Sequence, residues 1–447
     1  MSDAAVLADR AASILGELGL TAEIYLEDST ASSITVASGQ VESFEMKEEL
    51  GAGIRIFDGG RVGFAYTADL SPEGVQAAAS AARLLAEHTD ADPASVLPDP
   101  RAPGEADAAS GDTTVARVET YRKIALAKAM EDAARGADPR VVRVREARYG
   151  DLLGRIEVRN TKGFSRGGSL ARIYGSIDVI AEEKGASQAG HASDFALKIA
   201  ALDPFKIGRE AAHRAVGKLG ALRPATTRSD VLFDPAATAD LLQAFAPALF
   251  ADQVLKGKSF LAGEAGRKVA APCVSLVDDG RFPSADGSFP FDGEGVSTRR
   301  TVLIEEGVLR GYLHSAWTAA KMGVEPTGNS ARVSYTSLPR VGPTTIYMVP
   351  SARPAEEILG GVQEGFRITE LMGLHTVDPI TGEFSLGASG RRIRNGRLEE
   401  PVAGLGLAGS VARFLKDVAG VGSDLRLFPG SSAGSTILVR GLSVSGS

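Results

Sequence analysis

The run Pro-Thr-Gly-Asn-Ser-Ala-Arg at residues 326–332 is the most informative stretch of this sequence for its fold. Two other glycine-rich runs flank it, Phe-Asp-Gly-Glu-Gly-Val-Ser-Thr-Arg at 291–299 and Gly-Glu-Phe-Ser-Leu-Gly-Ala-Ser-Gly at 382–390. Glycine inside strand-like sequence marks bends and places where two backbones approach closely. The C-terminal half is therefore predicted to be rich in β-type segments, and a tight turn is expected at Gly328-Asn329.

Helical and strand patterns alternate along the rest of the chain without a regular period. Apolar residues recur at helical spacing from Leu7 to Leu18, and Ser71-Pro72 reads as the capped start of a helix that runs towards Glu87. Hairpin turns are predicted at Ser38-Gly39-Gln40, Asp58-Gly59-Gly60, Glu306-Gly307 and Asn395-Gly396. This arrangement indicates an α+β fold, with an N-terminal helix-and-sheet region followed by a β-rich C-terminal domain.

Length and composition set broad limits on the protein. A chain of 447 residues is too long for one ordinary core, so two or three domains are expected. Apolar residues make up 44% and charged residues 23%, which is typical of a globular protein, and no apolar run is long enough to span a bilayer. The start of the chain lacks the pattern of a secretory signal, and the single cysteine fits a reducing compartment, so a cytoplasmic location is expected. The net charge of −7 argues against direct nucleic-acid binding.

Two segments suggest how the chain divides into domains. Residues 88–113 contain four prolines among small and polar residues and read as a linker. The stretch Leu222–Thr227 is the preferred boundary, because the sequence after it becomes glycine-rich. We expect an N-terminal α+β domain over residues 1–222, with two subregions on either side of 88–113, and a β-rich C-terminal domain over 223–447.

The sequence offers little support for a metal centre. The closest two of the five histidines, His191 and His213, are 22 residues apart, so no helix can present two of them on neighbouring turns. Glu210 and His213 share one helix face, where an exposed contact is the commoner outcome. The acidic residues Asp278, Asp279, Asp286, Asp292 and Glu294 do not match a calcium loop and are expected to be solvated turn residues.

Motifs for nucleophilic or nucleotide chemistry are equally weak. Residues 430–434 fit Gly-x-Ser-x-Gly, but Phe428-Pro429 replaces the strand that must precede such an elbow, so Ser432 is expected in a loop. Cys273 is expected to be a small buried apolar residue. Residues 404–409 fit Gly-x-Gly-x-x-Gly without the preceding apolar strand, and residues 257–259 match only the end of a phosphate loop.

The three glycine-rich runs, together with residues 39–44 and 50–56, resemble the TldD/PmbA family, the "modulator of DNA gyrase" proteins. The resemblance covers most of the chain and implies metal-dependent peptide cleavage. TldD-type members carry a His-Glu-x-x-x-His metal site, whereas TldE/PmbA-type members lack it and pair with the first kind. The equivalent helix here, by its order along the chain, is Leu241 to Lys258, which contains no His and no Glu. This places the sequence in the TldE/PmbA branch.

The resemblance implies a cytosolic TldD–TldE heterodimer that encloses a chamber for unfolded peptides. This chain would have no metal, cofactor or catalytic residue of its own, and a zinc-type metal is expected in a TldD-type partner. Asn329 and Arg332 are the candidate peptide-binding residues, with a tight turn and an internal ion pair as their alternative roles. The alternative function is a non-proteolytic homodimer that binds peptides or acts as a scaffold. Neither nucleic acid nor a membrane is expected as a partner.

Overall fold

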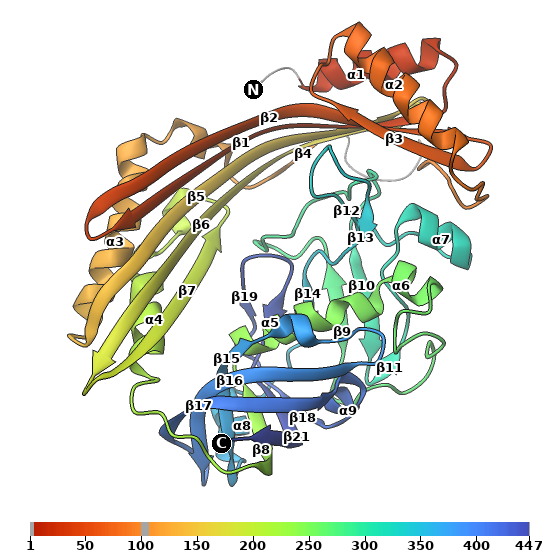
Figure 1. The fold of residues 1–447 in the computed structure, drawn as a ribbon. Helices are drawn as coiled ribbons and strands as arrows, with labels where there is room; N and C mark the ends of the chain where they lie inside the picture. Colours follow the sequence, from red (N-terminus) through yellow and green to blue (C-terminus); the bar gives the residue numbers. More distant parts are fainter. Residues whose placement is uncertain (1–3, 100–106, 447) are drawn as a thin grey trace.

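The N-terminal part of the chain builds one long, curved sheet that arches over the C-terminal part (Figure 1). The structure is a computed structural model and describes residues 4–99 and 107–446. The strands follow the order β3-β2-β1-β5-β6-β4, with β7 also paired to β6, and only the β4–β6 pair is parallel. Their bounds are Ala22–Ala37 for β1, Gln40–Asp58 for β2, Arg61–Thr67 for β3, Asp107–Ser110 for β4, Val141–Asn160 for β5, Ser165–Glu183 for β6 and Ala186–Ala196 for β7.

Several of these strands are longer than the sequence patterns predict. The residues before the predicted turn at Ser38-Gly39-Gln40 form one long strand, β1, whose backbone pairs with β2 on one side and β5 on the other. This double pairing holds the polar middle of β1 in the sheet even though its side chains lack an apolar alternation. The predicted linker over 88–113 is interrupted by β4, while residues 100–106 lie outside the described part.

Four helices cover the convex face of the curved sheet (Figure 1). They are α1 (Ala4–Glu17), α2 (Pro72–Glu87), α3 (Thr120–Ala137) and α4 (Pro204–Val216). The predicted start of α2 is confirmed, because Ser71 Oγ accepts a hydrogen bond from the Gly74 amide at 3.1 Å. Successive strand residues point to opposite faces, so Ile24 and Leu26 pack under α1 and α2 while Tyr25 faces the C-terminal part.

The C-terminal part consists mainly of a six-stranded and a four-stranded sheet, which confirms the predicted β-rich character. Its predicted Asn-Gly hairpin is present, with φ of +48° at Asn395 and +72° at Gly396. The six-stranded sheet is ordered β17-β16-β15-β8-β21-β18 and the four-stranded sheet β11-β10-β9-β14. The bounds are β8 Thr227–Phe233, β9 Leu276–Asp279, β10 Arg300–Glu305, β11 Val308–Leu309, β12 Ser330–Ala331, β13 Arg340–Val341, β14 Ile346–Met348, β15 Glu364–Met372, β16 Glu383–Arg394, β17 Arg397–Ser410, β18 Val418–Val421, β19 Arg426–Leu427, β20 Ala433–Gly434 and β21 Ile437–Ser445.

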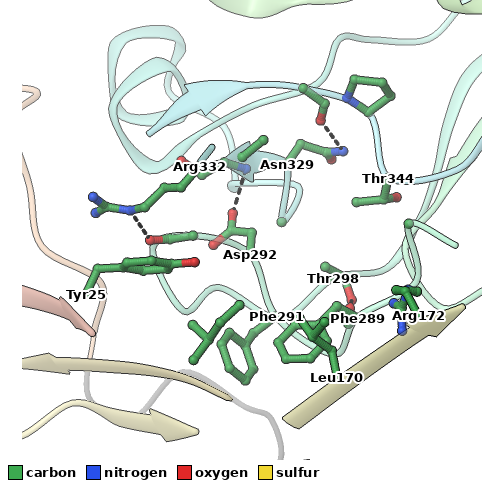
Figure 2. Close-up of a pocket in the computed structure, with 18 residues that line it drawn as sticks. Tyr25, Leu170, Arg172, Phe289, Phe291, Asp292, Thr298, Asn329, Arg332 and Thr344 are labelled. Carbon is green, nitrogen blue, oxygen red and sulfur yellow. Dashed lines mark hydrogen bonds between the residues drawn. The ribbon is translucent and has the colours of Figure 1, made fainter. Parts of the chain in front are cut away.

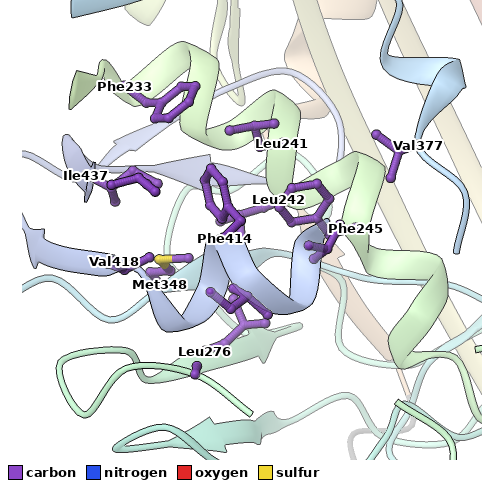
Figure 3. Packing of buried hydrophobic residues seen from close by; sticks show 14 of the residues in the cluster. Phe233, Leu241, Leu242, Phe245, Leu276, Met348, Val377, Phe414, Val418 and Ile437 are labelled. Carbon is purple, nitrogen blue, oxygen red and sulfur yellow. The ribbon is translucent and has the colours of Figure 1, made fainter. Parts of the chain in front are cut away.

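Short helices complete this half and close its core. They are α5 (Pro235–Phe245), α6 (Ala251–Leu255), α7 (Ala316–Met322), α8 (Ala355–Gly360) and α9 (Val411–Lys416). Phe414 of α9 packs between Phe233 and Phe245, with ring centroids 5.6 and 5.5 Å away (Figure 3). Helix α5 is thus packed into the hydrophobic core through Phe245. The predicted domain boundary after residue 222 lies in the segment between α4 and β8 and stays a prediction.

Candidate functional site

A cavity of about 220 Å³ lies where the concave face of the curved sheet meets loops of the C-terminal part. Its wall is apolar on the sheet side, with Leu170 of β6 facing Phe289 and Phe291 (Figure 2). Arg332, Asp292 and Asn329, all from the C-terminal glycine-rich runs, supply polar atoms at the other side. The cavity therefore combines an apolar surface with hydrogen-bonding groups, as small-ligand and side-chain sites do.

Asp292 organises the loop at the mouth of this cavity. Its Oδ1 accepts hydrogen bonds from the amides of Glu294 at 2.9 Å and Val296 at 3.0 Å, and its Oδ2 accepts one from the Ser330 amide at 2.9 Å. One carboxylate thus ties the 291–299 run to the 326–332 run. The two runs lie side by side through this carboxylate and through a hydrogen bond from the Gly293 amide to the Ser330 carbonyl.

Asn329 is buried and makes its hydrogen bonds inside the protein. Its Nδ2 donates to Asp278 Oδ2 at 2.7 Å and to the carbonyl of Gly342 at 3.1 Å. Gly328 before it has φ of +77°, and a Cβ there would lie 2.5 Å from the carbonyl oxygen of Ser297. Only glycine fits this turn, and the turn aims the Asn329 side chain inwards.

Arg332 carries a buried charge of the site. Its side chain is fully buried, its Nη2 forms an ion pair with Glu23 of β1, and its Nε donates to the carbonyl of Gly293 at 2.8 Å. The guanidinium also lies over the ring of Tyr25, 4.7 Å from its centroid. The internal ion pair that was the alternative expectation for Arg332 is present. Arg332 also lines the cavity, so a role in peptide binding stays a prediction.

Burial perturbs the titration of the acidic groups here. Burial, and then the neighbouring Glu294 carboxylate, raise the pKa of Asp292 to about 8. Burial also disfavours ionisation of Glu294, but Arg55 and further hydrogen bonds outweigh it, so the pKa of Glu294 is lowered. The expectation that Asp278, Asp292 and Glu294 are solvated turn residues is wrong, since all three are buried and hydrogen-bonded.

Among residues 4–99 and 107–446, no group of three or more His, Cys, Asp or Glu side chains is placed to hold a metal ion. The segment expected at the position of a metal-binding helix covers the end of α5, a 3₁₀ turn at Ala246–Leu249 and α6. Leu241, Leu242 and Phe245 in it are buried in the apolar core (Figure 3). Its acid Asp252 pairs with Lys256 at 3.3 Å. These side chains do not fit a metal.

The other catalytic motifs have structural roles. Residues 404–409 lie within β17, so their glycines cradle no phosphate. Ser432 is buried in a loop between β19 and β20, as expected, and no helix follows it. Cys273 is exposed, so the expectation of a buried thiol is wrong. Nearby apolar surface nevertheless raises the pKa of its thiol, which does not favour a reactive thiolate.

Sequence reasoning missed the N-terminal half of the site. Tyr25, Glu23 and Arg55 come from strands β1 and β2, more than two hundred residues before their partners. Polar residues such as Glu23 and Arg55 alternate with the apolar Ile24, Leu26, Ile54 and Ile56, which by itself is the pattern of a sheet with one solvated face. The sequence therefore carries no signal that the C-terminal loops cover this face.

Three models of one family match successive parts of this chain. They are PmbA/TldA metallopeptidase domain 1 over residues 22–86, the central domain over 114–219 and the C-terminal domain over 226–446. No helix in the described part of the chain is both long and apolar enough to cross a membrane.

Relatives match over nearly their whole lengths. The metalloprotease PmbA of Escherichia coli O157:H7 is 27% identical over 419 residues, covering 93% of this chain and 90% of that protein. A metalloprotease of Methanothermobacter thermautotrophicus is 31% identical over 422 residues, covering 91% and 88%. The crystal structure of a candidate modulator of DNA gyrase from Thermotoga maritima superposes with a TM-score of 0.90 at 26% identity, covering 98% and 99%. The chain belongs to the PmbA/TldD metallopeptidase family.

Proposed function

We propose that this protein is the TldE/PmbA-like, non-catalytic subunit of a TldD–TldE-type metallopeptidase that acts on unfolded peptides in the cytoplasm. The observation that carries the proposal is the segment from Leu241 to Lys258. Its side chains support the C-terminal core, and none of them is a histidine or a glutamate. A partner bearing His-Glu-x-x-x-His would supply the zinc-type metal and the chemistry.

In this role the cavity beside Phe289 and Phe291 would receive one side chain of an extended substrate. The apolar wall would take the side chain, while Asn329 and Arg332 would support peptide binding by holding the surrounding loops in the shape that receives the backbone. A site built this way recognises peptides by shape and backbone hydrogen bonds. This fits a complex that acts on unfolded chains of varied sequence.

The test is to purify the chain alone, then with a TldD-type partner, and to follow cleavage of an unfolded peptide with and without a chelator. We expect cleavage only by the mixture and loss of cleavage with the chelator. Chelator-sensitive cleavage by this chain alone, kept through successive purification steps, would contradict the non-catalytic assignment.

Light scattering on the same samples separates this role from the homodimeric scaffold. A subunit of the complex should leave any self-associated form and enter a heterodimer when the partner is added. If the chain keeps its own oligomeric state and still binds unfolded peptide, the scaffold function is favoured.

A further inference from the structure

A second, larger cleft of about 820 Å³ lies between helix α4 and the C-terminal sheets. On one side it is lined by the polar face of α4, and on the other by residues of β15, β16, β19 and the start of α5. It shares no lining residue with the cavity beside Phe291. Any ligand it holds is therefore distinct from the proposed peptide side chain.

The cleft is strongly basic in a chain whose net charge is −7. Seven lysine or arginine residues line it, against three acidic residues. The basic residues are Lys206, Arg209, Arg214, Lys218, Arg367, Arg391 and Arg426, and the acidic ones are Asp138, Glu210 and Asp234. Lys206 and Lys218 pair with Asp194 and Glu370 just outside this lining, so the excess of positive charge comes from the arginines. A concave surface with excess positive charge concentrates anions.

Two arginines face each other across the floor of the cleft. Arg367 of β15 and Arg391 of β16 are direct partners in the antiparallel register, so their side chains leave the same face of the sheet. Like charges placed directly opposite in this way destabilise a sheet. Arg391 donates to the carbonyl of Glu399 at 2.8 Å. The half-buried side chain of Arg367 makes no hydrogen bond or ion pair to any described residue, although its charge acts on the nearby carboxylate of Asp234. An anion between them would relieve the repulsion.

Other cations of the cleft are held in place by the protein. Glu210 of α4 accepts from Arg214 at 2.6 Å and pairs with Arg426 of β19 at 3.0 Å, which links the two sides of the cleft. Arg426 also lies 4.9 Å from the ring centroid of Phe428. Side chains that are already ordered lose less entropy when they bind a ligand. At the rim, Arg209 is exposed on α4. Its side chain makes no hydrogen bond or ion pair to any described residue, so its guanidinium is available to a ligand.

We propose that this cleft binds a condensed phosphate, either as free tripolyphosphate or as the triphosphate of a nucleotide. Guanidinium groups match phosphate oxygens in bidentate geometry, and cations on two sides of a cleft suit an anion with several charged groups. The lining contains no Phe, Tyr or Trp, and the imidazole of His213 is its one aromatic ring, which offers a base only a small stacking surface. Recognition therefore rests on the phosphate chain, and the two sources should bind alike.

Isothermal titration calorimetry on the full chain at low ionic strength tests this proposal with tripolyphosphate, ATP and orthophosphate. We expect tripolyphosphate and ATP to bind with similar affinity and orthophosphate far more weakly. Arg367→Gln should weaken tripolyphosphate binding about tenfold, the effect of one lost charge-assisted contact. Arg209→Gln should act in the same direction and, being an exposed position, protects the test against a folding defect in the first variant.

The matched control is Arg83→Gln, which removes the same charge from an exposed position on α2, away from the cleft. It should leave the affinity unchanged, and tripolyphosphate should raise the Tm of the control as it does that of the unaltered chain. Absence of tripolyphosphate binding overturns the proposal, as does binding of ATP alone. An equal loss of affinity in Arg83→Gln and Arg367→Gln also overturns it, because that result means diffuse attraction and no site.

Discussion

The guanidinium of Arg55, near the end of strand β2 of the curved sheet, lies 2.9 Å from the carboxylate of Glu294, which is 239 residues away in the sequence. Arg55 also pairs with Glu23 on the adjacent strand, and Glu23 in turn pairs with Arg332. Two acids and two arginines thus form a buried chain of alternating charge between the sheet and the C-terminal loops. This network holds the loop that carries Asp292 against the sheet, and with it the wall of the cavity.

Replacing Arg55 by methionine should destabilise the protein by about 3–5 kcal/mol, because it leaves the buried carboxylates of Glu23 and Glu294 without their shared partner. Chemical denaturation measures the loss. The control is Arg353→Met, which breaks an exposed ion pair with Glu357 and should change the free energy of unfolding by no more than about 0.5 kcal/mol. Equal losses of unfolding free energy in the two variants would mean that the buried network stabilises the protein no more than an exposed ion pair does.

Asp240 on α5 should make the protein less stable as the pH rises through the weakly acidic range. Burial, and then the neighbouring Asp234, raise the pKa of Asp240 to about 6, whereas the unfolded chain has the usual value of about 3.9. Between these values the folded chain keeps a proton that the unfolded chain has released. The free energy of unfolding therefore falls as pH increases from about 4 to about 6, and the loss is complete above that range.

Asp240→Asn removes this titration and should be more stable than the unaltered chain by about 2 kcal/mol near neutral pH, with little difference near pH 4. Urea denaturation of both proteins over this pH range gives the comparison, and their difference cancels the contribution of the other groups. A constant difference across the range would show that Asp240 does not titrate abnormally.

Truncation of Phe414 should test the packing of the C-terminal core. Phe414→Ala removes a ring packed against Phe233, Phe245 and Phe384 and should cost about 3–5 kcal/mol of stability. Val333→Ala is the control, since Val333 is 95% exposed and its truncation should be nearly neutral. Thermal denaturation distinguishes the two, and a small effect at Phe414 would argue against this packing.

Two glycine-to-alanine changes should have opposite signs. A Cβ at Gly63 on β3 would lie 1.8 Å from the carbonyl oxygen of Ala82 on α2, so Gly63→Ala should force the helix away and cost about 1–3 kcal/mol or more. Gly136 on α3 has open space around its Cβ position, so Gly136→Ala should stabilise by about 0.4–1 kcal/mol. Denaturant midpoints of the two variants check both directions at once, and stabilisation by Gly63→Ala would refute the close approach of α2.

Filling the cavity should impair peptide processing without unfolding the protein. Leu170→Trp would replace an aliphatic side chain by a larger indole ring in the space beside Phe289. Cleavage by the mixture with a TldD-type partner should then fall severalfold. The Tm and heterodimer formation should stay close to normal. Val142→Trp, at an exposed position on β5, controls for the added tryptophan. Unimpaired cleavage by a folded Leu170→Trp variant would show that the substrate does not use this cavity.

The sequence by itself determined most local structure and the family. Ser71-Pro72, Asp203-Pro204 and Asn395-Gly396 act within a few residues of themselves, because caps and tight turns depend on short-range hydrogen bonds and on φ. The largely apolar character of Leu241 to Phe245 could likewise be read directly from the sequence, and the α+β class followed from the irregular alternation of helix and strand patterns.

Only the tertiary structure decided how far the strands extend and where the charges lie. The polar middle of β1 is a strand because β2 and β5 pair with it on both sides. Asp278, Asp292 and Glu294 read as surface residues in the sequence, yet they are buried because distant amides and Arg55 supply the hydrogen bonds and the charge that burial requires. The basic cleft has the same origin, since Arg367 and Arg391 face each other through strand register and meet α4 only when the two halves pack together. Contacts between residues hundreds of positions apart depend on the packing of whole sheets, which no local pattern encodes.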